Sequence, residues 1–126
     1  MKRNMDLVRS ILLAIEENPT PSVEGYLAIP EVEPGPVTYH LHLLKEAGYI
    51  DAYAALDANT EYGFLMQDAS LTWRGHEFLD DIRDAEIWKK TKAGAAKAGS
   101  WSVGLLGELA RGYLRQKATE MGLPLV

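Results

Sequence analysis

Apolar residues near the N-terminus recur at the spacing of one face of a helix, and the charged residues around them lie mostly off that face. The apolar positions are Met5, Val8, Ile11, Leu12 and Ile15. The pattern predicts an amphipathic helix that ends at Asn18-Pro19, because proline disrupts a helix that has already begun.

The next segment, residues 20–36, contains four prolines and two glycines and therefore cannot form a long helix. Residues 25–29 are expected to form a short strand, with loop around them. From Pro36 the helical period returns, and Gly48 suits the left-handed position just past a helix end. The predicted helix, residues 36–47, places Val37, His40, Leu41 and Leu44 on one side and Thr38, His42 and Lys45 on the other.

Residues 49–56 and 64–71 are rich in aromatic and aliphatic side chains, and the segment between them is rich in turn formers. They predict a β-hairpin. Thr72 suits an N-cap, after which an apolar stripe predicts a helix to about Trp88 or Lys89. We expect Val37, Leu41 and Leu44 to be buried together with Ile11, Leu12, Ile15, Phe78 and Ile82.

Residues 89–100 mix lysine, alanine and glycine, which predicts a frayed helix end or a linker. A last helix over about 101–117, starting near Ser100 or Ser102, is interrupted by three glycines that each weaken it by roughly 1 kcal/mol. Such a helix needs a partner. The expected organisation is a domain at 1–92 followed by a linker and helix at 93–126, which packs on that domain or on a second copy as a homodimer.

Composition narrows the class of protein. The chain has 126 residues, no cysteine, 47% hydrophobic residues and 25% charged residues, which suits one folded core and excludes a disulfide-rich secreted protein and a disordered chain. No apolar run approaches the roughly 20 residues that span a bilayer. We therefore expect a cytoplasmic protein that makes no membrane contact.

Charge is distributed unevenly along the chain, whose formal net charge is −5. Residues 18–72 carry one lysine, Lys45, against eight acidic residues, a net of −7. Residues 93–126 carry four basic against two acidic residues, a net of +2. The middle of the chain is therefore acidic and its end mildly basic.

The order of predicted elements resembles the layout of a winged-helix domain: helix, short strand, helix with an Ala-Gly turn, hairpin, helix. Residues 37–50 resemble the recognition helix and following turn of bacterial winged-helix repressors. A second signature resembles the step after the wing in that superfamily: Leu71-Thr72-Trp73-Arg74-Gly75-His76-Glu77-Phe78-Leu79. Over about residues 1–120 the chain resembles a bacterial and prophage family known as a domain of unknown function.

The resemblance implies an α+β, winged-helix-like domain with a β-hairpin wing and an additional C-terminal helix. It implies a DNA-binding transcriptional regulator from a prophage or related element. One feature departs from that pattern, because residues 26–36 leave room for one turn at most where a scaffold helix would precede the recognition helix.

DNA contacts are expected first from the helix at 36–47, whose Thr38, Tyr39, His42 and Lys45 would face a major groove. A solvated helix face explains the same residues, since phosphate neutralisation needs more cations than that segment offers. A second basic surface is formed by Lys89, Lys90, Lys92 and Lys97, which Arg111, Arg115 and Lys117 could extend. A solubilising linker is its simpler explanation.

The alternative function is a protein-interaction module that uses its acidic surface as an adaptor or an inhibitor of a host protein. Its expected contact residues are Glu31, Glu33, Asp57 and Glu61. His40 and His42 stand two apart and point in different directions on a helix, so no metal site is expected. Phosphate loops, nucleophile elbows and dinucleotide fingerprints are missing from the sequence, and we expect neither catalysis nor a cofactor.

Overall fold

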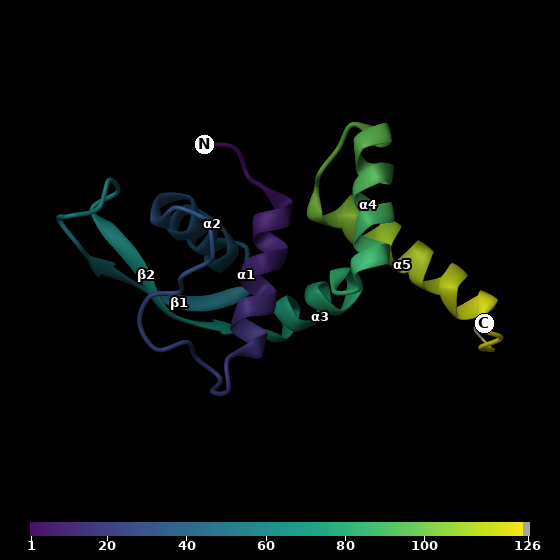
Figure 1. Ribbon diagram of the computed structural model, residues 1–126, viewed down its shortest axis with the longest axis horizontal. Coiled ribbons are helices and arrows are strands. Elements are labelled where there is room, and N and C mark those ends of the chain that lie inside the picture. Colours follow the sequence, from purple (N-terminus) through teal and green to yellow (C-terminus); the bar gives the residue numbers. More distant parts are fainter. Residues whose placement is uncertain (125–126) are drawn as a thin grey trace. The chain divides into compact units, whose positions relative to one another are not determined.

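The structure, a computed structural model, describes residues 1–124, which form five helices and one two-stranded antiparallel sheet (Figure 1). The elements are α1 (Met5–Glu17), α2 (Pro34–Glu46), β1 (Ile50–Leu56), β2 (Phe64–Leu71), α3 (Trp73–Ile82), α4 (Ala85–Ala98) and α5 (Val103–Glu120). The chain is therefore α+β, with the hairpin between helices as the sequence predicted. Within the described residues no helix is long and apolar enough to cross a membrane.

Internal contacts divide the chain into two compact units, the first spanning Met1–Leu79 and the second beginning at Asp80. Residues 92 and 93, between which the sequence places a boundary, both lie within α4. Residues 125 and 126, which belonged to the expected second part, lie outside the described residues.

The core of the first unit joins α1, α2 and the hairpin. Asn4 caps α1 by accepting the Leu7 N–H at 3.2 Å, and Asn18 ends the helix as predicted. The predicted core positions in this unit are all buried, including Ile11, Leu12 and Leu41, which have no exposed surface; Ile82, also buried, belongs to the second unit. The apolar periodicity of both helices thus identified the core correctly.

The segment between α1 and α2 forms no regular strand, contrary to the expectation for residues 25–29. Two isolated bridges, Ser22 to Ser70 and Tyr26 to Gln67, instead place it along β2. Asp68 fixes this contact: it stands in the left-handed region at φ 55°, its N–H donates to Gly25 O at 3.0 Å, and its carboxylate accepts the Gly25 N–H at 2.8 Å. The register of the hairpin shifts beside it, between Asp51 and Tyr53.

Helix α3 begins where the hairpin ends. The Thr72 hydroxyl accepts the Gly75 N–H at 3.1 Å and donates to Gly48 O at 2.6 Å, so Thr72 is the N-cap that the sequence predicted. Gly48 has φ 83°, the left-handed conformation expected after α2.

The single helix expected from Thr72 to about Lys89 is wrong, because α3 ends at Ile82 and a new helix begins at Ala85. Asp84 starts α4 by accepting the Ile87 N–H at 2.9 Å. For residues 89–100 the sequence left open a frayed helix end or a linker; of these, the linker is excluded, since α4 continues to Ala98 and Gly99 ends it at φ 74°. Alanine and lysine are good helix formers, and packing against α5 compensates for the glycine at position 94.

Helices α4 and α5 pack against each other in the second unit, and Figure 1 shows them crossing. A Cβ built on Gly94 would lie 3.2 Å from the Tyr113 hydroxyl and 3.3 Å from Leu109 Cδ1, so the missing side chain permits their close approach. Ser102 caps α5 by accepting the Leu105 N–H at 3.2 Å. The last helix was therefore predicted correctly, and its packing partner is α4.

Candidate functional site

The helix expected to enter a DNA groove is tied to α1 through its buried histidine. His40 Nε2 accepts the Asn4 N–H at 2.8 Å, and His40 Nδ1 lies 2.7 Å from Pro36 O. Because the Asn4 N–H can only donate, Nε2 must be unprotonated and the proton must sit on Nδ1. His40 is therefore a neutral, structural histidine, and its partners leave no room for a metal ion.

Only part of the expected DNA-reading face is available on α2. Thr38 is buried, so its placement on the outer side of the helix is wrong, because the hairpin covers that side and Thr38 lies in the same hollow as Phe64 and Leu65. Tyr39 is half-buried. His42 is exposed, with Nε2 3.6 Å from Glu46 Oε2 and its ring 6.3 Å from that of Phe64.

Lys45, the single lysine of the acidic segment, is held by β1. Its ammonium donates to Ala52 O, lies 3.8 Å from Asp51 Oδ1 and stands 5.6 Å from the centre of the Tyr53 ring. A lysine engaged in this way neutralises DNA phosphates poorly, since each new contact must replace existing ones. The face of α2 therefore offers few groups for phosphate binding.

A denser basic surface lies on α4, and we call it the α4 lysine face: Lys89, Lys90, Lys92 and Lys97. Three of these, Lys89, Lys90 and Lys97, are exposed and form no ion pair within residues 1–124. Lys92 differs, because its ammonium stands 6.0 Å from the centre of the Trp88 ring. Regular helical structure holds all four in fixed relative positions, which a linker would not.

The acidic residues that begin the second unit are already paired with basic residues away from that face. Asp81 binds Arg111 at 2.8 Å, Asp84 binds Lys117 at 3.0 Å, and Arg83 binds Asp80 at 2.7 Å. The Ile87 N–H, assisted by Lys117, lowers the pKa of the Asp84 carboxyl below its usual range. These pairs leave the charge of the α4 lysine face largely uncompensated.

Glu61 lines a cavity beside the first turn of α2, and Glu33, which does not line that cavity, directly precedes the helix. Glu33 is the N-cap residue of α2, and Glu61 belongs to the hairpin turn between β1 and β2. Between these elements lies a cavity of about 240 Å³, which we call the acidic hollow. It is lined by Pro34, Gly35, Thr38, Asn59, Thr60, Glu61, Tyr62, Phe64 and Leu65.

The other two expected acidic residues have different settings. Asp57 is part of the turn, where its carboxylate accepts the Asn59 N–H at 2.9 Å and its N–H donates to Gly63 O at 2.9 Å. Glu31 is exposed at φ 66°. Sequence reasoning missed the contribution of Thr38 and Tyr62 to the hollow, because no local pattern shows that the turn folds toward α2.

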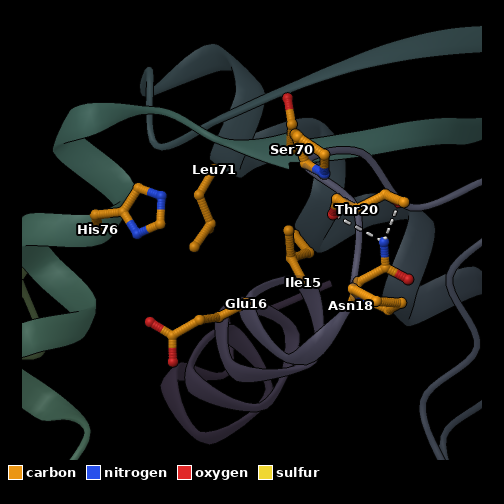
Figure 2. Close-up of a pocket in the computed structure, with 9 residues that line it drawn as sticks. Ile15, Glu16, Asn18, Thr20, Ser70, Leu71 and His76 are labelled. Carbon is orange, nitrogen blue, oxygen red and sulfur yellow. Dashed lines mark hydrogen bonds between the residues drawn. The ribbon is translucent and has the colours of Figure 1, made fainter.

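A second cavity, of about 440 Å³, lies between the end of α1, the following loop and the start of α3. Figure 2 shows His76 beside Leu71, Glu16 below both of them on α1, and Asn18 at the loop. The Asn18 amide donates to Thr20 Oγ1 at 2.8 Å and to Ser22 O at 3.1 Å, so it shapes the loop. Among residues 1–124 no group of three or more His, Asp or Glu side chains is placed to hold a metal ion.

Comparison with known proteins gives a family but no activity. The profile of the family described as "Hypothetical protein (DUF2513)" matches residues 2–101, which include α1 to α4. A protein of Haemophilus influenzae, called "Uncharacterized protein", is 41% identical over 98 residues, covering 73% of this chain and 76% of its own length. No solved structure matches the chain.

Proposed function

The chain belongs to the DUF2513 family, and we propose that it is a cytoplasmic, non-enzymatic, winged-helix-like protein that binds DNA as a transcriptional regulator. The resemblance to prophage proteins further suggests an origin in a mobile element. The order of helices around the hairpin supports the winged-helix-like description.

One observation carries the DNA-binding proposal: three exposed lysines on a regular helix have no acidic partner in the described chain, whereas Arg111 and Lys117 are paired. Unpaired cations on a rigid surface release counterions when they meet phosphates, and this release supplies most of the affinity for duplex DNA. The α4 lysine face therefore provides phosphate contacts. His42 and the half-buried Tyr39 remain as groups that would read bases.

A salt series tests this proposal directly. Binding of a random-sequence DNA duplex to the full chain is measured by fluorescence anisotropy between about 50 and 200 mM salt. Replacing Lys89, Lys90 and Lys97 together by glutamine should weaken binding and reduce the salt slope by about one unit for each phosphate that is no longer neutralised. Lys92 stays unchanged in this variant, because its removal would alter packing on Trp88 as well as charge.

The same helix offers a control in which an acidic residue is neutralised instead of the lysines. Glu86 is exposed on α4, and Glu86→Gln should leave affinity unchanged or increase it, because it removes negative charge near the lysines. Replacing Tyr39 and His42 should change sequence preference with little effect on the salt slope. A wild-type chain that does not bind at the lowest salt, or a triple-lysine variant with an unchanged slope, would refute the proposal.

The homodimer remains a prediction. Toward the end of α5, Leu114 and Ala118 form a shallow apolar hollow beside Arg111 and Arg115, which a second copy would cover. Sedimentation equilibrium should then show a dimer, and Leu114→Glu should convert it to a monomer. A wild-type chain that sediments as a monomer at all concentrations would exclude this contact.

A second candidate function is the binding of a basic protein partner by the first unit. Residues 1–79 contain five Lys and Arg against twelve Asp and Glu, a net of −7. Such a charge repels DNA and attracts basic proteins. Neutralising Glu31, Glu33 and Glu61 together should abolish capture of a basic partner, whereas the triple-lysine variant should retain it. Loss of capture in the lysine variant alone would refute the acidic surface as the contact.

A further inference from the structure

The acidic hollow has the dimensions of a site for one side chain. Its volume of about 240 Å³ is below the range of about 300 to 1,000 Å³ typical of small-molecule and cofactor sites. Both of its walls belong to the first unit: one is the first turn of α2 and the other is the hairpin turn with the start of β2. A guest of amino-acid side-chain size is therefore the natural occupant.

A polar group inside the wall of this hollow has no partner. Thr38 is 1% exposed, it is a lining residue, and its Oγ1 forms no hydrogen bond. A buried hydroxyl without a partner is unfavourable, and most such groups in folded proteins are satisfied. A guest with N–H donors would supply the missing hydrogen bond.

The charge of the guest follows from the groups at the opening. A helix N-terminus usually attracts anions through free N–H groups, but α2 has proline at its first and third positions, Pro34 and Pro36, which carry none. The hollow instead has an acidic lining residue, Glu61, and a second acid, Glu33, directly precedes the lining residue Pro34 in the chain. These groups favour a cation over an anion.

The aromatic residues that line the hollow favour a guanidinium over an ammonium group. Tyr62 and Phe64 line the hollow, and a Cβ built on Gly35 would lie 3.1 Å from Tyr62 Cε2, so the Tyr62 ring packs directly on the helix start. A guanidinium stacks on aromatic rings and offers five N–H donors, enough for the Glu61 carboxylate and the Thr38 hydroxyl together. An ammonium lacks the planar face.

We propose that the acidic hollow binds an arginine side chain of a basic protein partner. This inference rests on the second candidate function, the binding of a basic partner, and adds the residue that is recognised. The Glu61 carboxylate pairs with the guanidinium, the Thr38 hydroxyl accepts one of its N–H groups, and the Tyr62 and Phe64 rings cover its face.

The test uses the full chain and three short peptides that differ at one position. Acetyl-Gly-Gly-Arg-Gly-Gly-amide is titrated into the ¹⁵N-labelled protein, with lysine and the neutral arginine analogue citrulline as comparison peptides. We expect the arginine peptide to shift the amide signals of Gly35, Thr38 and Glu61. The lysine peptide should bind several-fold more weakly and the citrulline peptide not measurably.

Matched variants separate the hollow from general acidity. Glu61→Gln should weaken binding of the arginine peptide about tenfold, as expected when one charge-assisted hydrogen bond is removed, whereas Glu24→Gln, an exposed acid outside the hollow, should change affinity less than about twofold. Thr38→Val should also weaken binding without lowering the melting temperature, because it removes an unpaired hydroxyl at constant shape. Thr38→Ser, which keeps the hydroxyl, should retain binding.

Each other outcome overturns a defined part of the proposal. Equal binding of the arginine and citrulline peptides would show that the guanidinium charge is not recognised. Shifts confined to residues around Glu24 or Glu31 would refute the hollow as the site and leave the second candidate function standing. No shift with any peptide, even at millimolar concentration, would refute both.

Discussion

Close packing of α3 on the preceding chain explains why the sequence has a glycine, Gly75, early in this helix. A Cβ built at this position would lie 2.0 Å from Tyr49 O and 3.1 Å from Tyr49 C. Both are backbone atoms, so no side-chain rotation relieves the overlap. We predict that Gly75→Ala destabilises the first unit strongly, although alanine is the better helix former.

The magnitude follows from the groups that would have to move. An ordinary carbon–oxygen contact is about 3.3 Å, so the start of α3 must retreat by about 1 Å. That movement strains two hydrogen bonds of Thr72. Its N–H donates to Tyr49 O at 3.2 Å, and its hydroxyl donates to Gly48 O at 2.6 Å. Overpacking together with these weakened bonds should cost about 3 kcal/mol, a large share of a typical stability of about 5 to 15 kcal/mol.

Urea unfolding followed by circular dichroism measures the destabilisation, and hydrogen exchange of β1 and α5 peptides assigns it to a unit. Gly112→Ala is the matched control, because a Cβ at this helical position meets nothing within 4 Å. It should stabilise α5 by about 1 kcal/mol. If Gly75→Ala changed stability by no more than its control, the close approach of α3 to the Tyr49 carbonyl would be refuted.

Three further predictions concern buried and capping groups. Leu41→Ala should cost about 2 to 5 kcal/mol in urea unfolding, and a cost under about 0.5 kcal/mol would mean that α2 is not docked as described. The pKa of Asp84 is lowered, so its carboxylate makes its full contribution to the stability of α4 at pH values above the range in which an ordinary aspartate titrates. This contribution is lost as pH falls below about 4. The difference in melting temperature between wild type and Asp84→Asn should therefore shrink between about pH 6 and pH 3, and a constant difference would contradict this assignment. In ¹⁵N NMR spectra His40 should show a protonated Nδ1, and a protonated Nε2 would be incompatible with the bond from Asn4.

Local sequence patterns determined most of the elements. The helical spacing of apolar residues identified α1, α2 and α5, and the change to an extended pattern identified the hairpin. Both signals arise because burial of one face of an element imposes a regular spacing of apolar residues along the chain. The sequence also predicted the capping positions Thr72 and Gly48, because a cap acts on backbone groups within a few residues of itself.

The errors arose where short-range signals compete. An apolar stripe that continues from α3 into α4 gave no sign of a break, yet Asp84 captures the Ile87 N–H and begins a new helix. The sequence left the lysine- and alanine-rich segment around Gly94 open as a frayed helix end or a linker, because its helix packs on Leu109 and Tyr113 of α5, which lie far along the chain. Intrinsic propensity cannot report a partner that lies fifteen or more residues away.

The candidate sites show the same division. The sequence determined the lysines of α4 and the acidity of the first unit, because charge is a property of composition. Only the tertiary structure decided that Thr38 is buried beneath the hairpin, that Lys45 is occupied by β1, and that Glu61 meets the first turn of α2. These depend on the direction in which the hairpin turn folds, and that direction is set by contacts between residues far apart in the chain.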